Sequence, residues 1–363
     1  MKVAIIHYWL VNLRGGEKVI ESLCELFPEA DIFTHVYDEQ AFTDSIISKH
    51  KVSTTFISKL PKSAKLYQSY LPLMPLALEE LDLNGYDLII SSESGPAKGI
   101  IPPPGVPHIC YCHSPMRYAW DMYNDYKYKA GWFKRKLMPP LMHYLRRWDQ
   151  LNSTQVTHFV ANSQFVAKRI NSFYRREADV INPPVSFDDF SVSDKQGDFY
   201  LMLGQLVGYK RTDIAVNAFN RLGKRLIIVG EGEQFKELKS IAKENVTLLG
   251  RQPFSEIKRL LAECKALIFP GVEDFGIVPL EAMASGRPVI AFRRGGALET
   301  VADGLSGLFF DEQTEDSLLA AIEYFELKQH SFEPQKIRQY VKKFEKDRFK
   351  QEFKELVDSI IIE

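Results

Sequence analysis

The chain of 363 residues has no apolar run that approaches the roughly 20 residues needed to span a bilayer. Its N-terminus also lacks the basic segment and long apolar core of a secretory signal, because residues 3–7 begin directly with Val-Ala-Ile-Ile-His, a buried-strand pattern. We therefore expect a cytoplasmic protein that is at most peripheral to the inner face of the cell membrane.

Cysteine and net charge are also scarce. The chain has Cys24, Cys110, Cys112 and Cys264, and the Cys110-x-Cys112 pair lacks zinc-finger spacing, so we expect buried thiols in a reducing compartment. The 46 basic and 47 acidic residues give a net charge of −1, so no global field attracts nucleic acid or a membrane. Such a partner would need a local patch.

The chain does have a regular alternation of short apolar runs and amphipathic stretches, which is typical of βαβ units around a parallel sheet. The runs at residues 2–8, 86–91, 108–112 and 157–161 predict strands of one sheet. The runs at 199–203, 225–230, 246–250, 266–270 and 288–292 predict strands of a second. We expect an α/β fold of two Rossmann-like domains facing a cleft, with ligands beyond the carboxyl ends of the strands.

A segment with two adjacent prolines and a polar run separates the two series, over residues 182–198. Such a break predicts a hinge between domains. We place the domains at residues 1–187 and 188–334, followed by a charged helical segment over 335–363.

The densest motif begins at residue 269, where Glu273 and Glu281 lie on either side of Gly276. The predicted helix after Gly276 has free backbone N–H groups and a positive dipole end at its start, which suit a diphosphate. Alternatively, Glu273 is a solvated loop acid and Glu281 pairs with a neighbouring helix, and for an isolated spacing this would be preferred. The surrounding strand–loop–helix–strand pattern favours the functional interpretation.

This segment resembles the E-x7-E motif of the retaining GT-B glycosyltransferases of family 4, and the resemblance covers nearly the whole chain. The run from Gly295 resembles the stretch after the family's donor site, and residues 201–216 resemble its phosphate-binding loop. Gly15-Gly16, with Glu17 next, resembles its N-terminal glycine loop. The resemblance implies an acceptor domain at 1–187, a nucleotide-sugar domain at 188–334, and a C-terminal segment, 335–363, that packs back on the first domain.

The resemblance also implies roles for individual residues. Lys210 would contact the donor diphosphate as a cation, and Glu273 would hold hydroxyls of the transferred sugar. Glu281 would hold the ribose. Backbone amides to the phosphates would come from Gly276, Ile277 and Val278.

The chain departs from the family at one position, because Gln205 stands where an arginine is usual. A neutral amide stabilises a leaving diphosphate less than a guanidinium does. Arg211 is a candidate to supply the missing charge, and the alternatives are a weaker catalyst or a different phosphate geometry. Lys210 and Arg211 could also form a solvated basic helix start, although two cations there oppose the helix dipole unless an anion is bound.

A second motif follows the predicted strand at 108–112. His113 is followed by Arg117, Trp120 and Asp121, which could line a sugar site, although a lone histidine is more often a structural hydrogen-bonding group. The run resembles that of family members that include bacterial O-antigen mannosyltransferases. Ser163 lies in a stretch that resembles the family's contact with the donor β-phosphate, and it is also a candidate helix N-cap.

Residues 127–148 carry seven cations and no acid, interleaved with aromatic and apolar residues. This mixture suits the headgroup zone of an anionic membrane. A core helix with a solvated basic face explains it equally well. Nucleic acid is disfavoured as a partner because no recognition motif accompanies the patch.

The resemblance predicts an enzyme that transfers a hexose, best matched by mannose from GDP-mannose, to a glycan on a lipid carrier in cell-surface polysaccharide synthesis. We expect no metal cofactor, because the chain has no Asp-x-Asp sequence. The alternatives are another GDP- or UDP-sugar as donor, or a non-catalytic subunit that binds a nucleotide sugar for a partner.

Overall fold

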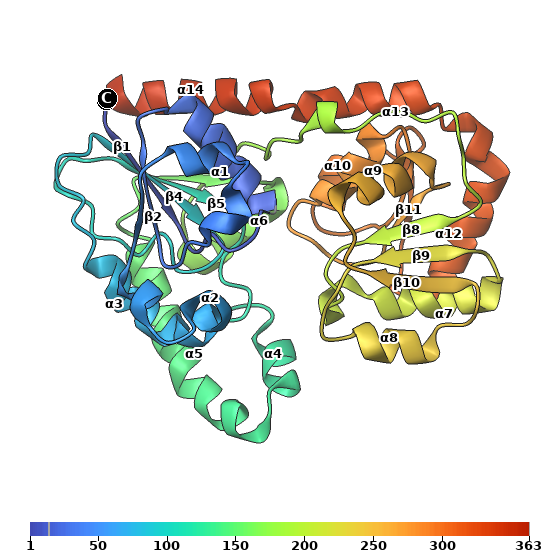
Figure 1. The fold of residues 1–363 in the computed structure, drawn as a ribbon, viewed down its shortest axis with the longest axis horizontal. Helices are drawn as coiled ribbons and strands as arrows, with labels where there is room; N and C mark the ends of the chain where they lie inside the picture. Colours follow the sequence, from blue (N-terminus) through green and yellow to red (C-terminus); the bar gives the residue numbers. More distant parts are fainter. Residues whose placement is uncertain (14, 363) are drawn as a thin grey trace. The chain divides into compact units, whose positions relative to one another are not determined.

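The computed structural model describes residues 1–13 and 15–362, and the chain forms two compact units. Unit 1 comprises Met1–Pro184 and the residues from Asp347 onward, and unit 2 comprises Val185–Lys346 (Figure 1). The chain first passes from unit 1 to unit 2 after Pro184, which lies within the hinge segment predicted at 182–198.

Unit 1 contains a parallel sheet of seven strands in the order β3-β2-β1-β4-β5-β6-β7. Four strands match the predicted runs closely: β1 (Val3–His7), β4 (Leu88–Glu93), β5 (His108–Cys112) and β6 (His158–Ala161). The other three were not predicted: β2 (Asp31–Thr34), β3 (Val52–Thr54) and β7 (Asp179–Val180).

Alternating strand residues face opposite sides of this sheet, and both sides are covered. On one side, Val19 and Leu23 of α1 and Phe353 of α14 pack against Ile5 and its neighbours on the sheet. The opposite side is covered by α3, α5 and α6. The helices of unit 1 are α1 (Gly15–Leu26), α2 (Ser63–Leu66), α3 (Met74–Glu79), α4 (Tyr123–Lys129), α5 (Trp132–Asn152), α6 (Gln164–Tyr174) and α14 (Lys346–Ile362).

Unit 2 contains a second parallel sheet, of six strands in the order β10-β9-β8-β11-β12-β13. Its predicted strands are β8 (Tyr200–Leu203), β9 (Leu226–Val229), β10 (Val246–Gly250), β11 (Leu267–Phe269) and β12 (Val289–Phe292); β13 (Gly307–Phe310) was not predicted. The two sheets thus bear out the predicted α/β class.

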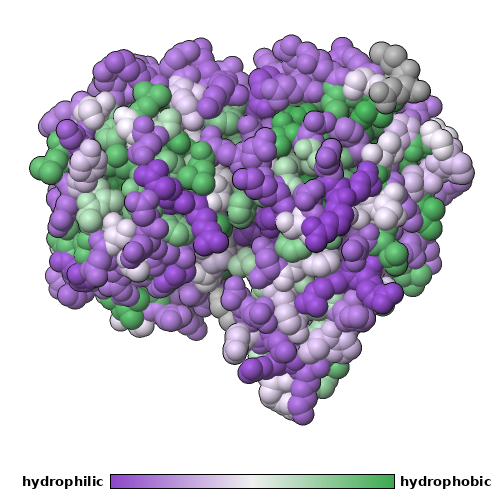
Figure 2. Space-filling view, turned by 180° about the vertical axis from the view of Figure 1, so that it is seen from behind, coloured by the Kyte–Doolittle hydropathy of each residue, from purple (hydrophilic) through white to green (hydrophobic). Residues whose placement is uncertain are grey.

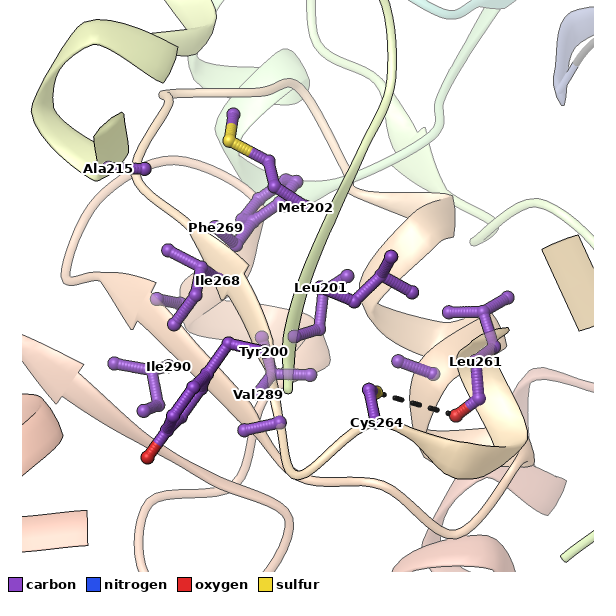
Figure 3. Close-up of a cluster of buried hydrophobic side chains, with 14 of the residues drawn as sticks. Tyr200, Leu201, Met202, Ala215, Leu261, Cys264, Ile268, Phe269, Val289 and Ile290 are labelled. Carbon is purple, nitrogen blue, oxygen red and sulfur yellow. Dashed lines mark hydrogen bonds between the residues drawn. The ribbon is translucent and has the colours of Figure 1, made fainter. Parts of the chain in front are cut away.

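Helices also cover both faces of the second sheet. Tyr200 of β8 contacts Phe219 of α7 and Phe325 of α12 on one face. On the other, Leu201 lies beside Leu261 of α9 and Cys264, whose thiol donates to the Leu261 carbonyl (Figure 3). The helices of unit 2 are α7 (Thr212–Leu222), α8 (Phe235–Ile241), α9 (Phe254–Glu263), α10 (Ile277–Ala284), α11 (Ala297–Thr300), α12 (Glu315–Lys328) and α13 (Pro334–Val341).

The C-terminal segment differs from the prediction that all of 335–363 packs on the first domain. Helix α13 belongs to unit 2, because Ile337 and Val341 join its core and Arg338 donates to the carbonyls of Phe190 and Ala284. Only the chain from Asp347 onward belongs to unit 1.

The four cysteines are buried thiols, as predicted. Among the described residues, no helix is both long and apolar enough to cross a bilayer.

Candidate functional site

In unit 2 the strand order reverses between β8 and β11, which pair directly with each other. In open parallel sheets, ligands bind outside the carboxyl ends of the strands at such a reversal point. The loop after β8 carries Lys210, and the loop after β11 carries Glu273. The structure therefore brings these two predicted site residues together at the position where the topology favours a ligand.

Lys210 and Glu273 form an ion pair with 2.7 Å between Nζ and Oε1. Their side chains are only 13% and 19% exposed, so the charges are partly desolvated. Gly204, which directly follows β8, has φ +148°, and a Cβ there would lie 2.8 Å from Lys210 Nζ. A side chain at this position would displace the ammonium group.

Helix α10 begins directly after this loop. Gly276 has φ +96°, a conformation that favours glycine, and it precedes the first helical residues Ile277 and Val278. The first N–H groups of a helix have no partner within it, and they carry the positive end of its dipole. Glu281 lies one turn further along and is partly exposed. The start of α10 therefore offers backbone N–H groups to an anion, and the Glu281 carboxylate lies one turn beyond these groups.

Gln205 and Arg211 lie in the same loop region but have different surroundings. The side chain of Gln205 is exposed. The Arg211 guanidinium binds Asp213, with 3.0 Å from Nη2 to Oδ2, and also donates to Gln313 at 3.3 Å. Arg211 would have to give up part of this pairing to replace the missing arginine at position 205.

Unit 1 has its own reversal point, between β1 and β4. His7 ends β1, Ser92 lies in β4, and His113 follows the neighbouring strand β5. The Ser92 hydroxyl lies 3.0 Å from His7 Nδ1 and 2.9 Å from His113 Nε2. One buried serine therefore joins the predicted histidine to a second histidine, at the carboxyl edge of the sheet.

The surroundings of His113 determine its protonation state. Burial and the neighbouring His7 lower the pKa of His113 to about 3, so the ring is neutral at pH 7. Ser92 has one hydroxyl hydrogen, so it can donate to only one of the two rings. The other ring then donates to the Ser92 oxygen. Glu17 Oε1 lies 3.7 Å from His7 Nε2, which is beyond hydrogen-bond distance, and its negative charge favours a hydrogen on that nitrogen. In the arrangement in which His7 carries its hydrogen on Nε2 and accepts from Ser92, His113 donates from Nε2 and keeps a lone pair on Nδ1.

The glycine loop predicted from the sequence adjoins this group. Gly15 and Gly16 form the first turn of α1, and a methyl group on Gly16 would lie 3.8 Å from His113 Nε2. That distance is ordinary van der Waals contact, and the closer neighbour of such a methyl group is the Tyr8 hydroxyl, at 3.0 Å. Glu17, which follows, is buried beside His7.

A fully buried charge cluster lies behind His113. Lys98 contacts Asp149 and lies 3.4 Å from Glu93 Oε1, while Glu93 Oε2 accepts the N–H groups of Ala97 and Lys98. The carbonyl of Glu93 accepts the N–H of His113 at 2.8 Å. Burial raises the pKa of Glu93 to about 7, and the two carboxylates raise the pKa of Lys98 against the effect of burial. The cluster anchors the chain on which His113 sits.

The remaining polar residues of this region have structural contacts. Ser163 caps α6 by accepting the N–H of Val166, as the alternative interpretation proposed. Trp120 donates to Asp149 at 2.7 Å and stacks on Phe173. Asp121 accepts Arg169 at 2.7 Å.

Sequence reasoning missed His7, Ser92, Glu93, Lys98 and Asp149. Buried polar residues inside otherwise apolar strand runs, as in Ile-Ile-Ser-Ser-Glu at 89–93, are the signal that could have revealed the first part of this set. Asp149 lies in a basic, amphipathic segment and has no local signature.

Two family models match the chain. Residues 186–344 match the model of glycosyl transferases group 1, and residues 13–189 match that of glycosyltransferase family 4. Together they span most of both units.

Several curated proteins are similar over part of their length. A GDP-mannose-dependent alpha-(1-6)-phosphatidylinositol monomannoside mannosyltransferase of Mycolicibacterium smegmatis is 29% identical over 231 residues, which cover 55% of this chain and 59% of that protein. An alpha-1,3/1,6-mannosyltransferase of Dictyostelium discoideum is 28% identical over 217 residues, covering 52% and 47%. The chain spans about half the length of the curated relatives it matches.

Solved structures are similar over the whole chain. A crystal structure of Anabaena HepE in complex with UDP and glucose has a TM-score of 0.74 at 16% identity, covering 99% of this chain and 100% of that one. Sucrose-phosphate synthase from Thermosynechococcus elongatus also has a TM-score of 0.74 at 16% identity, covering 100% and 99%. At these identities the likeness shows a shared fold.

Proposed function

We propose that the chain is a GT-B glycosyltransferase of family 4, because models of glycosyl transferases group 1 and of glycosyltransferase family 4 match its two units. It would transfer a hexose from a nucleotide sugar to a hydroxyl of a glycan acceptor, with retention of anomeric configuration. In its most specific form, the donor is GDP-mannose and the glycan is carried on a lipid, as expected in cell-surface polysaccharide synthesis.

The observation that carries this proposal is the Lys210–Glu273 pair at the reversal point of the second sheet. A nucleoside diphosphate leaving group accumulates negative charge as the sugar departs. A partly desolvated ammonium, together with the amides at the start of α10, would stabilise that charge without reorganisation. Glu273 would turn from Lys210 to the sugar hydroxyls, and Glu281 would hold the ribose.

In unit 1, His113 would contact a sugar hydroxyl at the carboxyl edge of the sheet. Its neutral ring keeps a lone pair on Nδ1, so it would accept a hydrogen bond from a hydroxyl. Gly15, Gly16 and Ser163 would belong to the phosphate-binding surface of the same unit. Ser163 can keep its capping contact in that role, because the cap uses an oxygen lone pair, whereas a phosphate would accept the hydroxyl hydrogen that Ser163 donates to Asn162 Oδ1 in this structure.

Mannose is supported by the names of two relatives, which are mannosyltransferases, one of them dependent on GDP-mannose. Similar structures contain UDP or UDP-glucose, which supports a uridine nucleotide as the alternative donor.

Thermal shift with GDP-mannose, UDP-glucose and UDP-galactose would test the donor. A ligand at 100 times its Kd stabilises the protein by about 2.7 kcal/mol, so the true donor should stand out. The cognate donor should then give product with a lipid-linked glycan, and NMR of that product should show the anomeric configuration of the donor. If only UDP-sugars stabilise the protein, a UDP-sugar replaces GDP-mannose as the proposed donor.

We propose that the reaction needs no metal ion, because the chain lacks the Asp-x-Asp sequence that commonly binds a metal–diphosphate complex. Turnover should be unchanged in EDTA. Loss of turnover that Mn²⁺ restores would contradict this.

The exposed Gln205 favours a second candidate, a non-catalytic subunit that binds the nucleotide sugar for a partner. A neutral amide gives weaker charge stabilisation than arginine. Transfer or donor hydrolysis by the purified chain alone would eliminate this candidate, whereas donor binding without turnover would establish it.

A further inference from the structure

Helices α4 and α5 form a hairpin in unit 1, drawn in green in Figure 1. The C-terminal half of α5 is anchored, because Met142, Leu145 and Trp148 join the core against the sheet. The N-terminal half is different: its side chains from Trp132 to Leu137 are all exposed. The core-helix interpretation of residues 127–148 therefore holds for the second half of the segment only.

The exposed surface carries an apolar stripe. Phe133, Leu137 and Tyr144 are 60%, 51% and 48% exposed, and Pro140 between them is also exposed. Residues spaced by four, seven and eleven positions lie on one side of a helix. Trp132, at the start of α5, is 73% exposed. This stripe is separate from the face that packs on the core.

Cations surround the stripe. Lys136 lies over the Trp132 ring at 5.4 Å and Arg135 over the Tyr128 ring at 5.3 Å, so charges and exposed aromatic rings share one surface. Within the part of the chain that the structure describes, no carboxylate forms an ion pair with Lys134, Arg135, Lys136 or Arg147. In Figure 2 the projection at the bottom of the picture mixes purple hydrophilic side chains with pale and green ones.

The charges on this surface of α5 indicate which kind of partner it can bind. A second copy of the chain would bring the same cations to the stripe and be repelled. An anionic bilayer supplies negative headgroups for the cations and an apolar interior for Phe133 and Leu137, with Trp132 at the boundary. We propose that the N-terminal half of α5 docks on an anionic lipid surface, with its apolar stripe inserted and its cations among the headgroups.

Sedimentation with lipid vesicles tests this proposal. The full chain should bind vesicles containing phosphatidylglycerol at low salt, and it should bind neutral phosphatidylcholine vesicles weakly. High salt should release it, because the attraction is screened. The triple variant Lys134→Glu, Arg135→Glu, Lys136→Glu should lose roughly 100-fold or more in vesicle affinity at low salt.

The apolar contribution needs its own variant. Phe133→Ser with Leu137→Ser should weaken binding while keeping every charge. Brominated lipids should quench the fluorescence of bound wild-type protein, and Trp132→Phe should remove most of this quenching. These residues are exposed, so all the variants should unfold at the wild-type temperature.

Matched controls lie in unit 2. Lys236→Glu, Lys239→Glu, Lys328→Glu makes the same charge change at exposed lysines, and Ile241→Ser with Leu327→Ser removes exposed aliphatic side chains. Neither should affect vesicle binding. The donor-induced thermal shift should be unchanged in every variant.

Three results would overturn the proposal: vesicle binding that survives both α5 variants, binding without quenching by brominated lipids, or concentration-dependent dimerisation that Phe133→Ser with Leu137→Ser abolishes. Equal binding to nucleic acid at the same salt, lost in the triple variant, would assign the surface to that partner instead.

Discussion

Units 1 and 2 each have a parallel sheet with helices on both faces, but they bury different polar groups. Unit 1 encloses Glu93, Lys98 and Asp149 with no exposed surface, together with several histidines. Among the described residues of unit 2, the one charged side chain buried as a whole is Arg287, whose guanidinium donates to backbone carbonyls. The core of unit 2 is a single apolar cluster, whereas that of unit 1 is divided into several.

The difference shows two ways to position a candidate functional side chain after a strand. In unit 2, Lys210 and Glu273 lie in glycine-containing loops above a continuous apolar core, and they pair with each other. In unit 1, His113 is positioned by buried hydrogen bonds through Ser92 and Glu93. Buried polar groups are costly when a partner is lost. Unit 1 should therefore be the more sensitive to single substitutions and to pH.

The largest effect is expected for Asp149→Ala. The Asp149 carboxylate accepts Trp120 Nε1 at 2.7 Å and the Tyr174 hydroxyl at 2.8 Å, and it pairs with Lys98. Removing one partner of a buried ion pair costs about 3–5 kcal/mol of the free energy of unfolding. Hydrogen exchange by mass spectrometry should show this loss in peptides of unit 1.

The control for this prediction is Asp198→Ala in unit 2. Asp198 pairs with Lys265 at 2.7 Å, but its side chain is 92% exposed, so little stability should be lost. Equal losses in the two variants would show that the buried cluster contributes no more than a surface pair.

Lys210→Ala should lower turnover by roughly 10²–10³-fold, the usual effect of removing one charge-stabilising donor. It should leave the stability of unit 2 nearly unchanged, because the apolar core is not involved. Lys265→Ala is the matched control: this lysine is 19% exposed, is also ion-paired, and lies before β11 rather than after it. A loss of turnover below threefold for Lys210→Ala would place the diphosphate elsewhere.

Much of this comparison could be predicted from the sequence. The long buried strands were recognisable because apolar runs such as residues 3–7 and 226–229 are continuous. Among the strands that were missed, β7 has only two residues, and β2 and β3 are only partly buried, so their pattern does not differ from that of a loop. The motif at 273–281 identified Glu273 and its helix, and Lys210 came from the family resemblance.

The contacts that position these residues could not be predicted. Ser92 lies 85 residues from His7 and 21 from His113, and no local periodicity encodes such contacts. The pairing of Lys210 with Glu273 depends on β8 being next to β11, which is a property of the whole sheet. The end of unit 2 at Lys346 was missed because α13 and α14 are both charged amphipathic helices, and the sequence does not show which core each one meets.

Acid should lower the stability of unit 1 more than that of unit 2. Burial lowers the pKa of His35, His108 and His113 to about 3 each, whereas in the unfolded chain these rings titrate near 6.5. Below that pH the unfolded state binds more protons, so the stability of unit 1 falls as the pH falls. Burial raises the pKa of Glu93 to about 7, so the folded state takes up one proton first, which offsets one of the three.

The net difference of two protons corresponds to about 3 kcal/mol of unfolding free energy per pH unit between about pH 6 and 5. Hydrogen exchange at a series of pH values should show unit 1 losing protection over this interval while unit 2 changes little. Loss of protection in both units together would mean that the buried histidines do not control acid stability.

The smallest effect, and the most specific, is expected from adjacent serines of β4. Ser92→Ala and Ser91→Ala each remove a fully buried hydroxyl. The Ser92 hydroxyl contacts His113 and His7, and the Ser91 hydroxyl contacts His108 at 2.7 Å. Each variant leaves a buried ring nitrogen without its partner, so both should lose about 1–3 kcal/mol of stability.

Only Ser92→Ala should also change catalysis, because His108 begins β5 at the far end of the strand from His113. Without the hydroxyl, the hydrogen of His113 is no longer held on Nε2. Turnover should fall roughly tenfold, the factor that corresponds to one hydrogen bond of about 1.4 kcal/mol. Ser92→Thr, which keeps a hydroxyl, should restore it. Imidazole ¹⁵N shifts should show a mixture of His113 tautomers in Ser92→Ala and a single form in Ser91→Ala. Equal turnover in the two alanine variants would reduce Ser92 to a stability residue, and His113 would then be positioned by the backbone contact with Glu93 alone.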